Sequence, residues 1–440
     1  MAQSVLNFTV ESTDEKLTPR AGEAVFGEFL KALRIDKLCN KHLPLPRSNR
    51  GYNPYTFIHP ILLMLHSGGR YLEDVRMISS DNALRELLHV KKVPTADSIG
   101  KWLKRSTQNK VEGMEKINRV LLQRYLSKLE DPLVLDIDAT VIESHKSIAF
   151  TTYKMFPGFT PIIGHMNGGY VIHQEFRTGN VAPADNNLSF VQQCEAQLPE
   201  DKKIHILRAD AASYQADLFN YCNTNEIMYL IGGHLDSSVM RSIKEITHWQ
   251  SLKTKEGKAH HLQEEVAEFI HTMNDTDHSF RMIVVKKTVT PVLHGMEQLL
   301  SEEELISYAS ERYGVIATNA PEEMRAEEIV SLYRKRGDTS ENRIKELKNG
   351  FNLKYLPTSH FEANALYFHI GTLAYNLFIL FKQILHASWQ KHTIETIRYK
   401  LYHIAGKVIK HARQMTLKIN HQFLEIFNTI RKKNYEISLE

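Results

Sequence analysis

The apolar residues in the first 130 positions recur at helical spacing. In residues 21–33 apolar side chains stand three or four positions apart, and residues 82–89 repeat the spacing. Residues 55–66 show it too, directly after the helix-breaking Pro54. This spacing places apolar side chains along one face of a helix. We therefore predict an all-α N-terminal region over residues 1–130.

One of these predicted helices is basic on its outer face. In VPTADSIGKWLKRS either Thr95 or Asp97 can cap the helix start. The cations that point outward are Lys101, Lys104 and Arg105. Short helices that end in such a helix are typical of helix-turn-helix DNA-binding regions. An ordinary amphipathic helix of a bundle remains the alternative.

The hydrophobic pattern changes at residue 131. PLVLDIDATVI is β-branched and mostly apolar, which favours a strand buried on both faces. Residues 168–180 predict a second strand, and residues 140–147 a further one between the two. Helices at 186–198 and 213–222 then alternate with the strands KIHILRAD and EIMYLIGG. Residues 131–235 therefore predict the first part of an α/β core with a mixed sheet.

Residues 236–321 read as an insertion with its own strands. FRMIVVKKTV and YGVIATNA are strand-like, and an acidic helix is expected over residues 296–311. Helical patterns return at 322–335, 340–348 and 361–385, so residues 322–385 complete the core. Basic helices are expected over residues 386–440. The apolar stretch 365–381 is shorter than the ~20 residues of a membrane span, so we interpret it as a buried helix.

The composition narrows the class of protein. With 42% apolar and 24% charged residues, the chain matches folded soluble proteins rather than disordered ones. Three widely separated cysteines exclude a disulfide scaffold and suit a reducing cytosol. The first residues lack the basic start and apolar core of a signal peptide.

Charge is distributed unevenly along a chain whose net charge is +4. Residues 131–330 are net acidic, whereas the segments on both sides are net basic. This distribution is expected if the centre holds carboxylates for a metal and the flanks contact a polyanion. Chance clustering of charges on solvated faces is the alternative.

Acidic residues stand at the ends of two apolar strands. Asp136 and Asp138 are two positions apart in VLDIDATV, so both project from the same sheet face, and Asp210 ends IHILRAD. Catalytic groups collect at the carboxyl ends of strands in α/β sheets, and paired carboxylates suit Mg²⁺. Each aspartate could instead cap the turn that follows it.

A third acidic residue lies in LYRKRGDTSENRIKELKNGF. Here Gly337 is expected to end one helix and Glu341 to begin the next. Asp338 and Glu341 could form a capping box, in which the glutamate only stabilises the helix start. The neighbouring Tyr333, Arg336 and Lys348 favour instead a role for Glu341 in a functional site.

Taken together, these motifs resemble the DDE transposases of bacterial insertion sequences. The resemblance is to the branch with a Y-(2)-R-(3)-E-(6)-K signature, the insertion sequence four-like and thirteen-eighty-like group. Tyr333, Arg336, Glu341 and Lys348 reproduce the signature, except that four residues separate the arginine from the glutamate. The other matching elements are the DxDxT around Asp138, R-x-G-N at 177–180, R-x-D at 208–210 and LAYNL at 373–377.

The resemblance implies an RNase H-like core with a β-containing insertion. It implies a catalytic triad of Asp138, Asp210 and Glu341 that binds two Mg²⁺ ions, for which Mn²⁺ can substitute. Asp138 is preferred to Asp136 because the family's first acid precedes a small residue and a threonine. The remaining signature residues, Tyr333, Arg336 and Lys348, would contact DNA.

The activity so implied is cleavage of double-stranded DNA at the terminal inverted repeats of the element, followed by strand transfer into target DNA. The implied protein is a homodimer on DNA, cytoplasmic and nucleoid-associated, with no membrane partner. Trp249 is either the aromatic residue that holds a flipped base in related transposases or a core residue. Two other functions stay open: a catalytically inactive, transposase-derived DNA-binding protein, and an unrelated carboxylate-pair hydrolase, for example a glycosidase.

Overall fold

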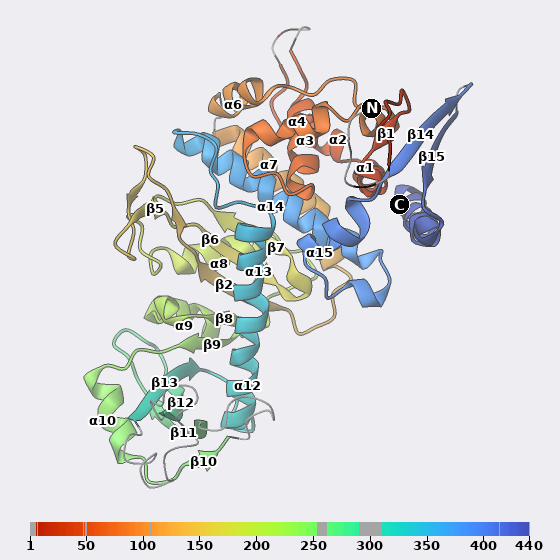
Figure 1. Ribbon diagram of the computed structural model, residues 1–440. Coiled ribbons are helices and arrows are strands. Elements are labelled where there is room, and N and C mark those ends of the chain that lie inside the picture. Colours follow the sequence, from red (N-terminus) through yellow and green to blue (C-terminus); the bar gives the residue numbers. More distant parts are fainter. Residues whose placement is uncertain are drawn as a thin grey trace. The chain divides into compact units, whose positions relative to one another are not determined.

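The chain folds into two compact units in a computed structural model (Figure 1). The structure describes residues 6, 8–46, 48, 51–105, 108–252, 262–289, 310–412 and 414–439. Unit 1 combines Met1–Ile117 with Glu346–Glu440, and unit 2 is Asn118–Lys345. The chain therefore leaves unit 1 once and returns to it, so that residues near both ends belong to the same unit.

Unit 1 is mainly helical. Its N-terminal helices are α1 (Ala21–Ala32), α2 (Ile35–His42), α3 (Pro54–His66), η1 (Leu72–Val75), α4 (Arg76–Ser79), α5 (Asn82–Leu87), α6 (Ala96–Lys104) and the first half of α7 (Gln108–Leu126). Its C-terminal helices are η5 (Glu346–Gly350), α14 (Phe361–Gln383), η6 (Ala387–Trp389), α15 (Ile394–Ile397), η7 (Arg398–Tyr402), η8 (His421–Phe423) and α16 (Leu424–Leu439). The helices predicted at 21–33, 55–66 and 82–89 are confirmed. The short strand β1 (Leu17–Thr18) is the exception to an all-α N-terminal region.

The core of unit 1 is built around α14. Residues 363–381 of this helix are all buried, and the helix packs against α1, α3 and α6. Among the described residues it is the one helix long and apolar enough to cross a membrane, and its most apolar window is 100% buried in the protein. The prediction of a buried core helix over 365–381 is thus confirmed.

A hairpin interrupts the helices of the C-terminal segment. Strands β14 (Gly406–His411) and β15 (Gln414–Ile419) pair antiparallel and join β1 in a three-stranded sheet. The prediction of helices alone over 386–440 is wrong here, and Lys407 and Lys410 lie on a strand. Exposure alternates along β15, as it does in a strand with one solvated face. Gly406 allows close packing, since a Cβ there would lie 2.7 Å from the Cβ of Ala21.

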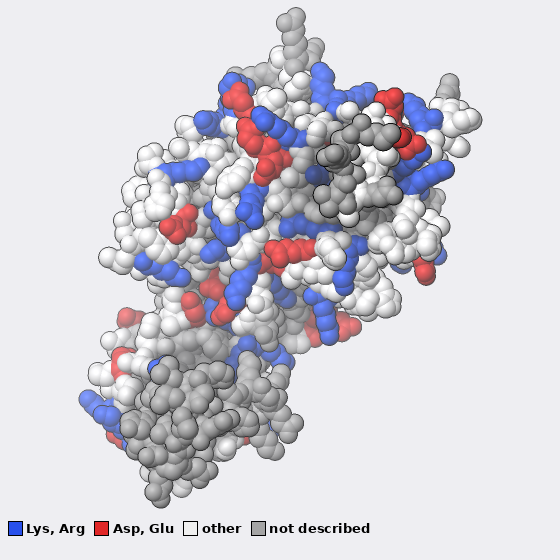
Figure 2. Space-filling view, in the orientation of Figure 1, with Lys and Arg blue, Asp and Glu red and all other residues white. Residues whose placement is uncertain are grey.

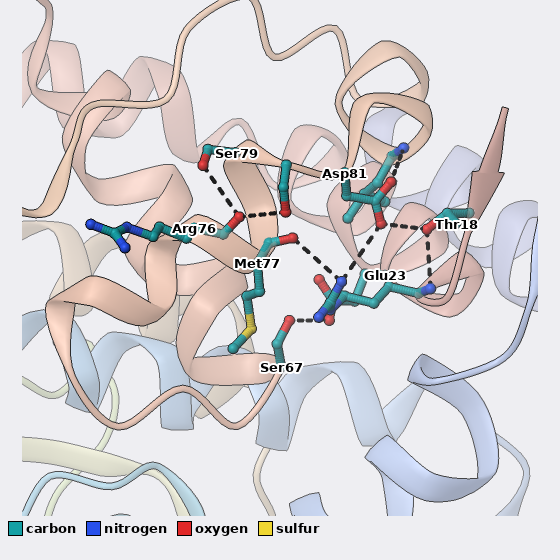
Figure 3. Close-up of polar contacts among 10 residues, drawn as sticks. Thr18, Glu23, Ser67, Arg76, Met77, Ser79 and Asp81 are labelled. Carbon is teal, nitrogen blue, oxygen red and sulfur yellow. Dashed lines mark hydrogen bonds and ion pairs between the residues drawn. The ribbon is translucent and has the colours of Figure 1, made fainter. Parts of the chain in front are cut away.

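A buried polar network lies beside β1 in unit 1 (Figure 3). The hydroxyl of Thr18 donates to Asp81 at 2.6 Å, and the hydroxyl of Ser67 donates to Glu23. The guanidinium of Arg20 lies 3.7 Å from the Asp81 carboxylate. Glu23 is completely buried, and burial raises the pKa of its carboxyl to about 8. Glu23 is therefore held protonated in the folded protein at neutral pH.

Unit 2 is built on one nine-stranded sheet with the order β10-β11-β12-β13-β9-β8-β2-β6-β7. The strands are β2 (Val134–Ala139), β6 (Ile162–Met166), β7 (Val171–Glu175), β8 (Ile206–Ala209), β9 (Met228–Gly232), β10 (Gln250–Ser251), β11 (Leu262–His271), β12 (Phe280–Val289) and β13 (Ser310–Thr318). β2, β8 and β9 run parallel, whereas β6, β7 and β13 pair antiparallel with their neighbours. The predicted mixed sheet is confirmed.

The third core strand differs from the prediction. The strand between β2 and β7 is β6, and the segment predicted there, residues 140–147, contributes only β3 (Ile142–Glu143). β3 joins β4 (Phe150–Thr151) and β5 (Pro157–Phe159) in a small separate sheet. Every residue of β6 is buried. Gly164 and His165 interrupt its apolar pattern, so the sequence did not predict this strand.

The strands of the insertion extend the core sheet. β13 pairs with β9 at Ile316 and Gly232, and β12, β11 and β10 follow outward. The helical elements of unit 2 are η2 (Asn167–Gly169), α8 (Asn187–Glu195), η3 (Ala211–Ser213), α9 (Ala216–Thr224), α10 (Ser237–Glu245), α12 (Ala326–Arg336), η4 (Gly337–Glu341) and α13 (Asn342–Lys345). The acidic helix predicted over 296–311 lies outside the described residues, except for its last two positions, which begin β13.

Candidate active site

Two aspartates meet at the carboxyl ends of adjacent parallel strands. Asp136 on β2 stands opposite Arg208 on β8. Two residues further along the chain from this pair stand Asp138, still on β2, and Asp210, directly after β8, and the two carboxyl groups interact electrostatically. The ends of these two central strands of unit 2 therefore lie at one edge of the sheet.

Asp136 is engaged in a buried ion pair. Its Oδ1 accepts a hydrogen bond from Nε of Arg208, and its Oδ2 accepts one from Nη2, each at 2.7 Å. Nη1 of Arg208 donates to the backbone oxygen of Leu332 on α12, also at 2.7 Å. Because both Asp136 oxygens accept from an arginine, this pair favours Asp138 as the candidate metal ligand. The link from Arg208 to α12 was not foreseen from the sequence.

Asp138 lies in a mostly buried setting among other charges. Arg336 is the last residue of α12, and its Nη2 lies 3.2 Å from Oδ2 of Asp138. The Arg336 side chain is 10% exposed and the Asp138 side chain 15%. Burial raises the pKa of Asp138 to about 6; Arg336 opposes the rise, while Asp210 and Glu341 add to it. Asp138, Asp210, Glu341 and Arg336 therefore interact electrostatically at this edge.

Asp210 follows β8 and caps the short helix η3. Its Oδ1 accepts a hydrogen bond from the backbone N–H of Ala212 at 3.1 Å. The local alternative of a capping aspartate is thus correct for this oxygen. The cap also fixes the direction of the side chain at the end of the strand.

The candidate third acid stands on a helix that does not end where the sequence predicted. Gly337 has helical backbone angles (φ −57°, ψ −43°), and α12 continues through the π-turn η4 into α13. The predicted break at Gly337 and the new helix start at Glu341 are therefore wrong. η4 packs beside β2, and Glu341 is exposed at its end.

A π-turn, η4, separates Arg336 from Glu341. A π-turn closes its hydrogen bonds between residues five apart, against four in an α-helix. Residues at i and i+5 across η4 therefore lie on nearly the same face, as i and i+4 do in an α-helix. Arg336 and Glu341 are five positions apart across this turn.

Tyr333 lies over the end of strand β9. A Cβ built on Gly232 would come within 2.9 Å of the Tyr333 hydroxyl and 3.0 Å of the backbone N of Ala211. Burial raises the pKa of Tyr333; Arg336 lowers it, and Asp210, Asp138 and Glu341 raise it. Tyr333 and the three acids therefore share one electrostatic environment.

Contacts with the insertion strands hold α12 in place. Glu264 on β11 accepts a hydrogen bond from Arg334 at 2.8 Å and lies 3.3 Å from Lys287. Arg281 on β12 donates to the backbone oxygen of Met324 just before the helix, at 2.9 Å. Trp249 directly precedes β10; it is half-buried, and Nζ of Lys286 lies 4.5 Å from its ring centroid. Its role toward a flipped base stays a prediction.

The other predicted DNA contacts belong to unit 1. Lys348 is half-buried on η5, and the basic set on α6 is exposed. Thr95 caps α6 as predicted, by accepting from the N–H of Ser98 at 3.3 Å. Asp97 lies 2.8 Å from Lys101, so this lysine has an acidic neighbour on its own helix.

Basic and acidic side chains are interspersed over the face of the molecule in view in Figure 2. DNA binding by Lys101, Lys104, Arg105 and Lys348 stays a prediction.

The donor chemistry of the acidic edge fits a hard divalent cation. Carboxylate oxygens are the ligands that Mg²⁺ takes. Within the described ranges, however, no three acidic, histidine or cysteine side chains lie close enough to hold one ion together. The cation in contact with Asp138 here is Arg336.

Comparison with known proteins agrees with the motifs at this edge. No curated protein matches the chain. The family model described as "Transposase DDE domain group 1" matches residues 3–431, nearly the whole length. On this match the chain belongs to the DDE transposases, in the family of the transposase DDE domain, group 1.

Proposed function

We propose that this transposase cleaves DNA at the ends of an insertion sequence and joins them to target DNA, with Asp138, Asp210 and Glu341 as ligands of two Mg²⁺ ions. The observation that carries the proposal is the parallel pairing of β2 with β8, in which Asp136 pairs with Arg208, two residues before Asp138 and Asp210 respectively. The helix with Tyr333 and Arg336 supports it, because these side chains interact electrostatically with the same acids.

Divalent cations bound at such carboxylates supply an activated water or 3′-hydroxyl nucleophile and stabilise the leaving oxygen during in-line attack on phosphorus. The protein's own groups orient the reactants. Arg336 offers a guanidinium suited to a phosphate, and Tyr333 places a hydroxyl beside the same edge. Arg208 holds the helix that carries both through Leu332.

Replacement of Asp210 by Asn tests the proposal. The D210N variant should bind a duplex of the inverted repeats that flank the coding region as the wild type does, because the fold and the basic surfaces are unchanged. Mg²⁺-dependent cleavage of that duplex should be abolished. The matched control is D217N, since Asp217 is exposed on the next helix, α9. Full cleavage and strand transfer by D210N would remove this residue from the site.

The proposal includes a cytoplasmic homodimer that forms on DNA, with α6 and Lys348 as DNA contacts. One observation favours a second candidate, a transposase-derived DNA-binding protein without catalysis. This observation is the contact of Arg336 with Asp138, together with the lack of a three-acid cluster among the described residues. Mg²⁺-dependent nicking of the inverted repeats by the purified chain would exclude this candidate, and duplex binding without nicking would support it.

A further inference from the structure

The β14–β15 hairpin of unit 1 is rich in cations. Its residues 406–419, GKVIKHARQMTLKI, include four lysine or arginine residues and no aspartate or glutamate. Like charges on one small element repel each other unless solvent, salt or an anionic partner compensates them. The hairpin is therefore a candidate surface for an anionic partner.

Pairing of the two strands gives the hairpin an inner and an outer face, because residues directly opposite each other point to the same side of a sheet. Val408 is buried and pairs with the half-buried Leu417 on the inner face. On the same side Nζ of Lys410 lies 3.7 Å from Glu86, on the neighbouring helix α5. The outer face carries Lys407, Ile409, His411, Gln414, Thr416 and Lys418, all half-buried or exposed.

Two lysines stand directly opposite each other on the outer face. Lys407 on β14 pairs with Lys418 on β15, an arrangement that destabilises a strand pair when nothing neutralises it. Lys407 forms an ion pair with Glu15, whereas no carboxylate of the described residues pairs with Lys418. One carboxylate thus serves two ammonium groups, and the outer face keeps a positive charge that a polyanion would stabilise.

The shape of the hairpin suits duplex DNA. Each strand has six residues and so extends over about 20 Å. The major groove of B-DNA, about 12 Å wide, admits a two-stranded β-ribbon. In Figure 1 the tip of the hairpin points away from α1, which leaves the outer face open. The side chains of Gln414 and Thr416, both exposed, can donate hydrogen bonds to phosphate oxygens beside the lysines.

We propose that the outer face of the β14–β15 hairpin binds the phosphate backbone of duplex DNA, with Lys407 and Lys418 as its cations. Glu15 weakens this contact, because its carboxylate repels phosphate and neutralises one of the two lysines. The inference rests on the proposed function, to which it adds a DNA-binding element apart from α6 and Lys348. Phosphates are the same in every sequence, so the contact is independent of the sequence of the duplex.

The test measures binding of a fluorescein-labelled, mixed-sequence duplex to the full-length chain by fluorescence anisotropy at several salt concentrations, with EDTA present to prevent cleavage. Loss of one phosphate contact in K418Q should weaken binding about fivefold to tenfold near 0.1 M salt and lower the salt slope by about 0.9. The matched control is K37Q, since Lys37 is exposed on α2 and removes the same charge. K37Q should bind as the wild type does.

Two further variants test the same face without removing a lysine. T416E places a negative charge on the outer face and should weaken binding even if K418Q folds poorly by circular dichroism. E15Q should change the affinity in the opposite direction and bind the duplex more tightly than the wild type. E112Q, at an exposed position on α7, is its control and should leave the affinity unchanged.

Wild-type affinity and salt slope in both K418Q and T416E would overturn the inference and leave the proposed function intact. Lys418 would then only hinder pairing of the edge strand β15 with other chains. Weaker binding by E15Q would also contradict it. If the wild-type chain itself binds no duplex at low salt, the proposed function is wrong together with this inference.

Discussion

Asp136 and Arg208 form a buried ion pair with two hydrogen bonds of 2.7 Å that joins the neighbouring strands β2 and β8. The remaining outer nitrogen of Arg208 reaches Leu332, one residue before Tyr333. The pair therefore connects the strands that carry the two aspartates to the helix that carries Tyr333 and Arg336. It links the strand half of the candidate site to the helix half.

Replacing Asp136 by Asn should strongly destabilise the protein. The change leaves the buried guanidinium of Arg208 without its counter-charge, which typically costs about 3–5 kcal/mol. Urea unfolding of D136N at neutral pH measures this loss. E143Q is the control: Glu143 is exposed, and a surface change should alter the unfolding free energy by less than about 0.5 kcal/mol. A D136N protein as stable as wild type would show that the pair does not support the fold.

Glu23 should make stability depend on pH. Its pKa rises from 4.5 to about 8 on folding, so the folded chain holds a proton that the unfolded chain releases. Its contribution is complete below pH 4.5, falls as the pH rises, and is lost above pH 8. E23Q keeps a neutral group of the same size and should flatten this fall, becoming more stable than wild type above pH 8.

Unfolding free energies of E23Q and wild type between pH 5 and pH 9 give the measurement. Each unit of pKa shift corresponds to about 1.4 kcal/mol, so a difference of several kcal/mol is expected at the alkaline end. E112Q, at an exposed position on α7, should follow the wild-type curve. Parallel curves for E23Q and wild type would mean that Glu23 is ionised in the folded protein.

An alanine at Gly232 should damage the candidate site. Its Cβ would lie 2.9 Å from the Tyr333 hydroxyl and 3.0 Å from the backbone N of Ala211, next to Asp210. The tyrosine or the strand end must move, at a cost of about 1–3 kcal/mol for overpacking. We expect a lower Tm and weaker Mg²⁺-dependent cleavage of the inverted repeats.

The control for this substitution lies in the same sheet. A Cβ at Gly314 on β13 would meet nothing within 4 Å, so G314A should leave Tm and cleavage unchanged. Equal behaviour of G232A and G314A would show that Tyr333 does not occupy the space above Gly232.

Gly337→Ala should stabilise the protein. The residue has helical angles, its Cβ would have open space, and glycine in a helix costs about 0.5–1 kcal/mol relative to alanine. Urea unfolding should show a gain of that size. G164A is the contrasting variant, because its Cβ would lie 2.6 Å from Sγ of Cys194. A loss of stability in G337A would mean that the π-turn requires glycine.

Much of the core could be predicted because its strands are β-branched and apolar. VLDIDA and MYLIG predict β2 and β9. The aspartates at the end of β2 and directly after β8 indicate the candidate site. β6 was not predicted because IIGHM contains a glycine and a histidine, although all five residues are buried. The hairpin β14–β15 was not predicted because GKVIKH and QMTLKI lie among further basic residues, and their mixed basic and apolar pattern also suits a basic amphipathic helix.

The missing parts of the site depend on tertiary contacts. A sequence can mark Arg208 as part of a motif, but its partners, Asp136 and Leu332, are distant in the chain. The capping signals after Gly337 were genuine local preferences, and packing of the continuous helix beside β2 overrode them. The placement of Glu264 against Arg334 likewise joins an inserted strand to a helix about seventy residues later.

The π-turn at Gly337–Glu341 bears on how relatives of this chain can be found. A motif search requires a fixed number of residues between the signature residues, whereas the function depends on the directions of their side chains. A single inserted codon within a helix would ordinarily rotate everything downstream by about 100°. A π-turn has more residues per turn than an α-helix, so it can accommodate one inserted residue. A chain whose signature residues are spaced differently can therefore carry the same arrangement of side chains.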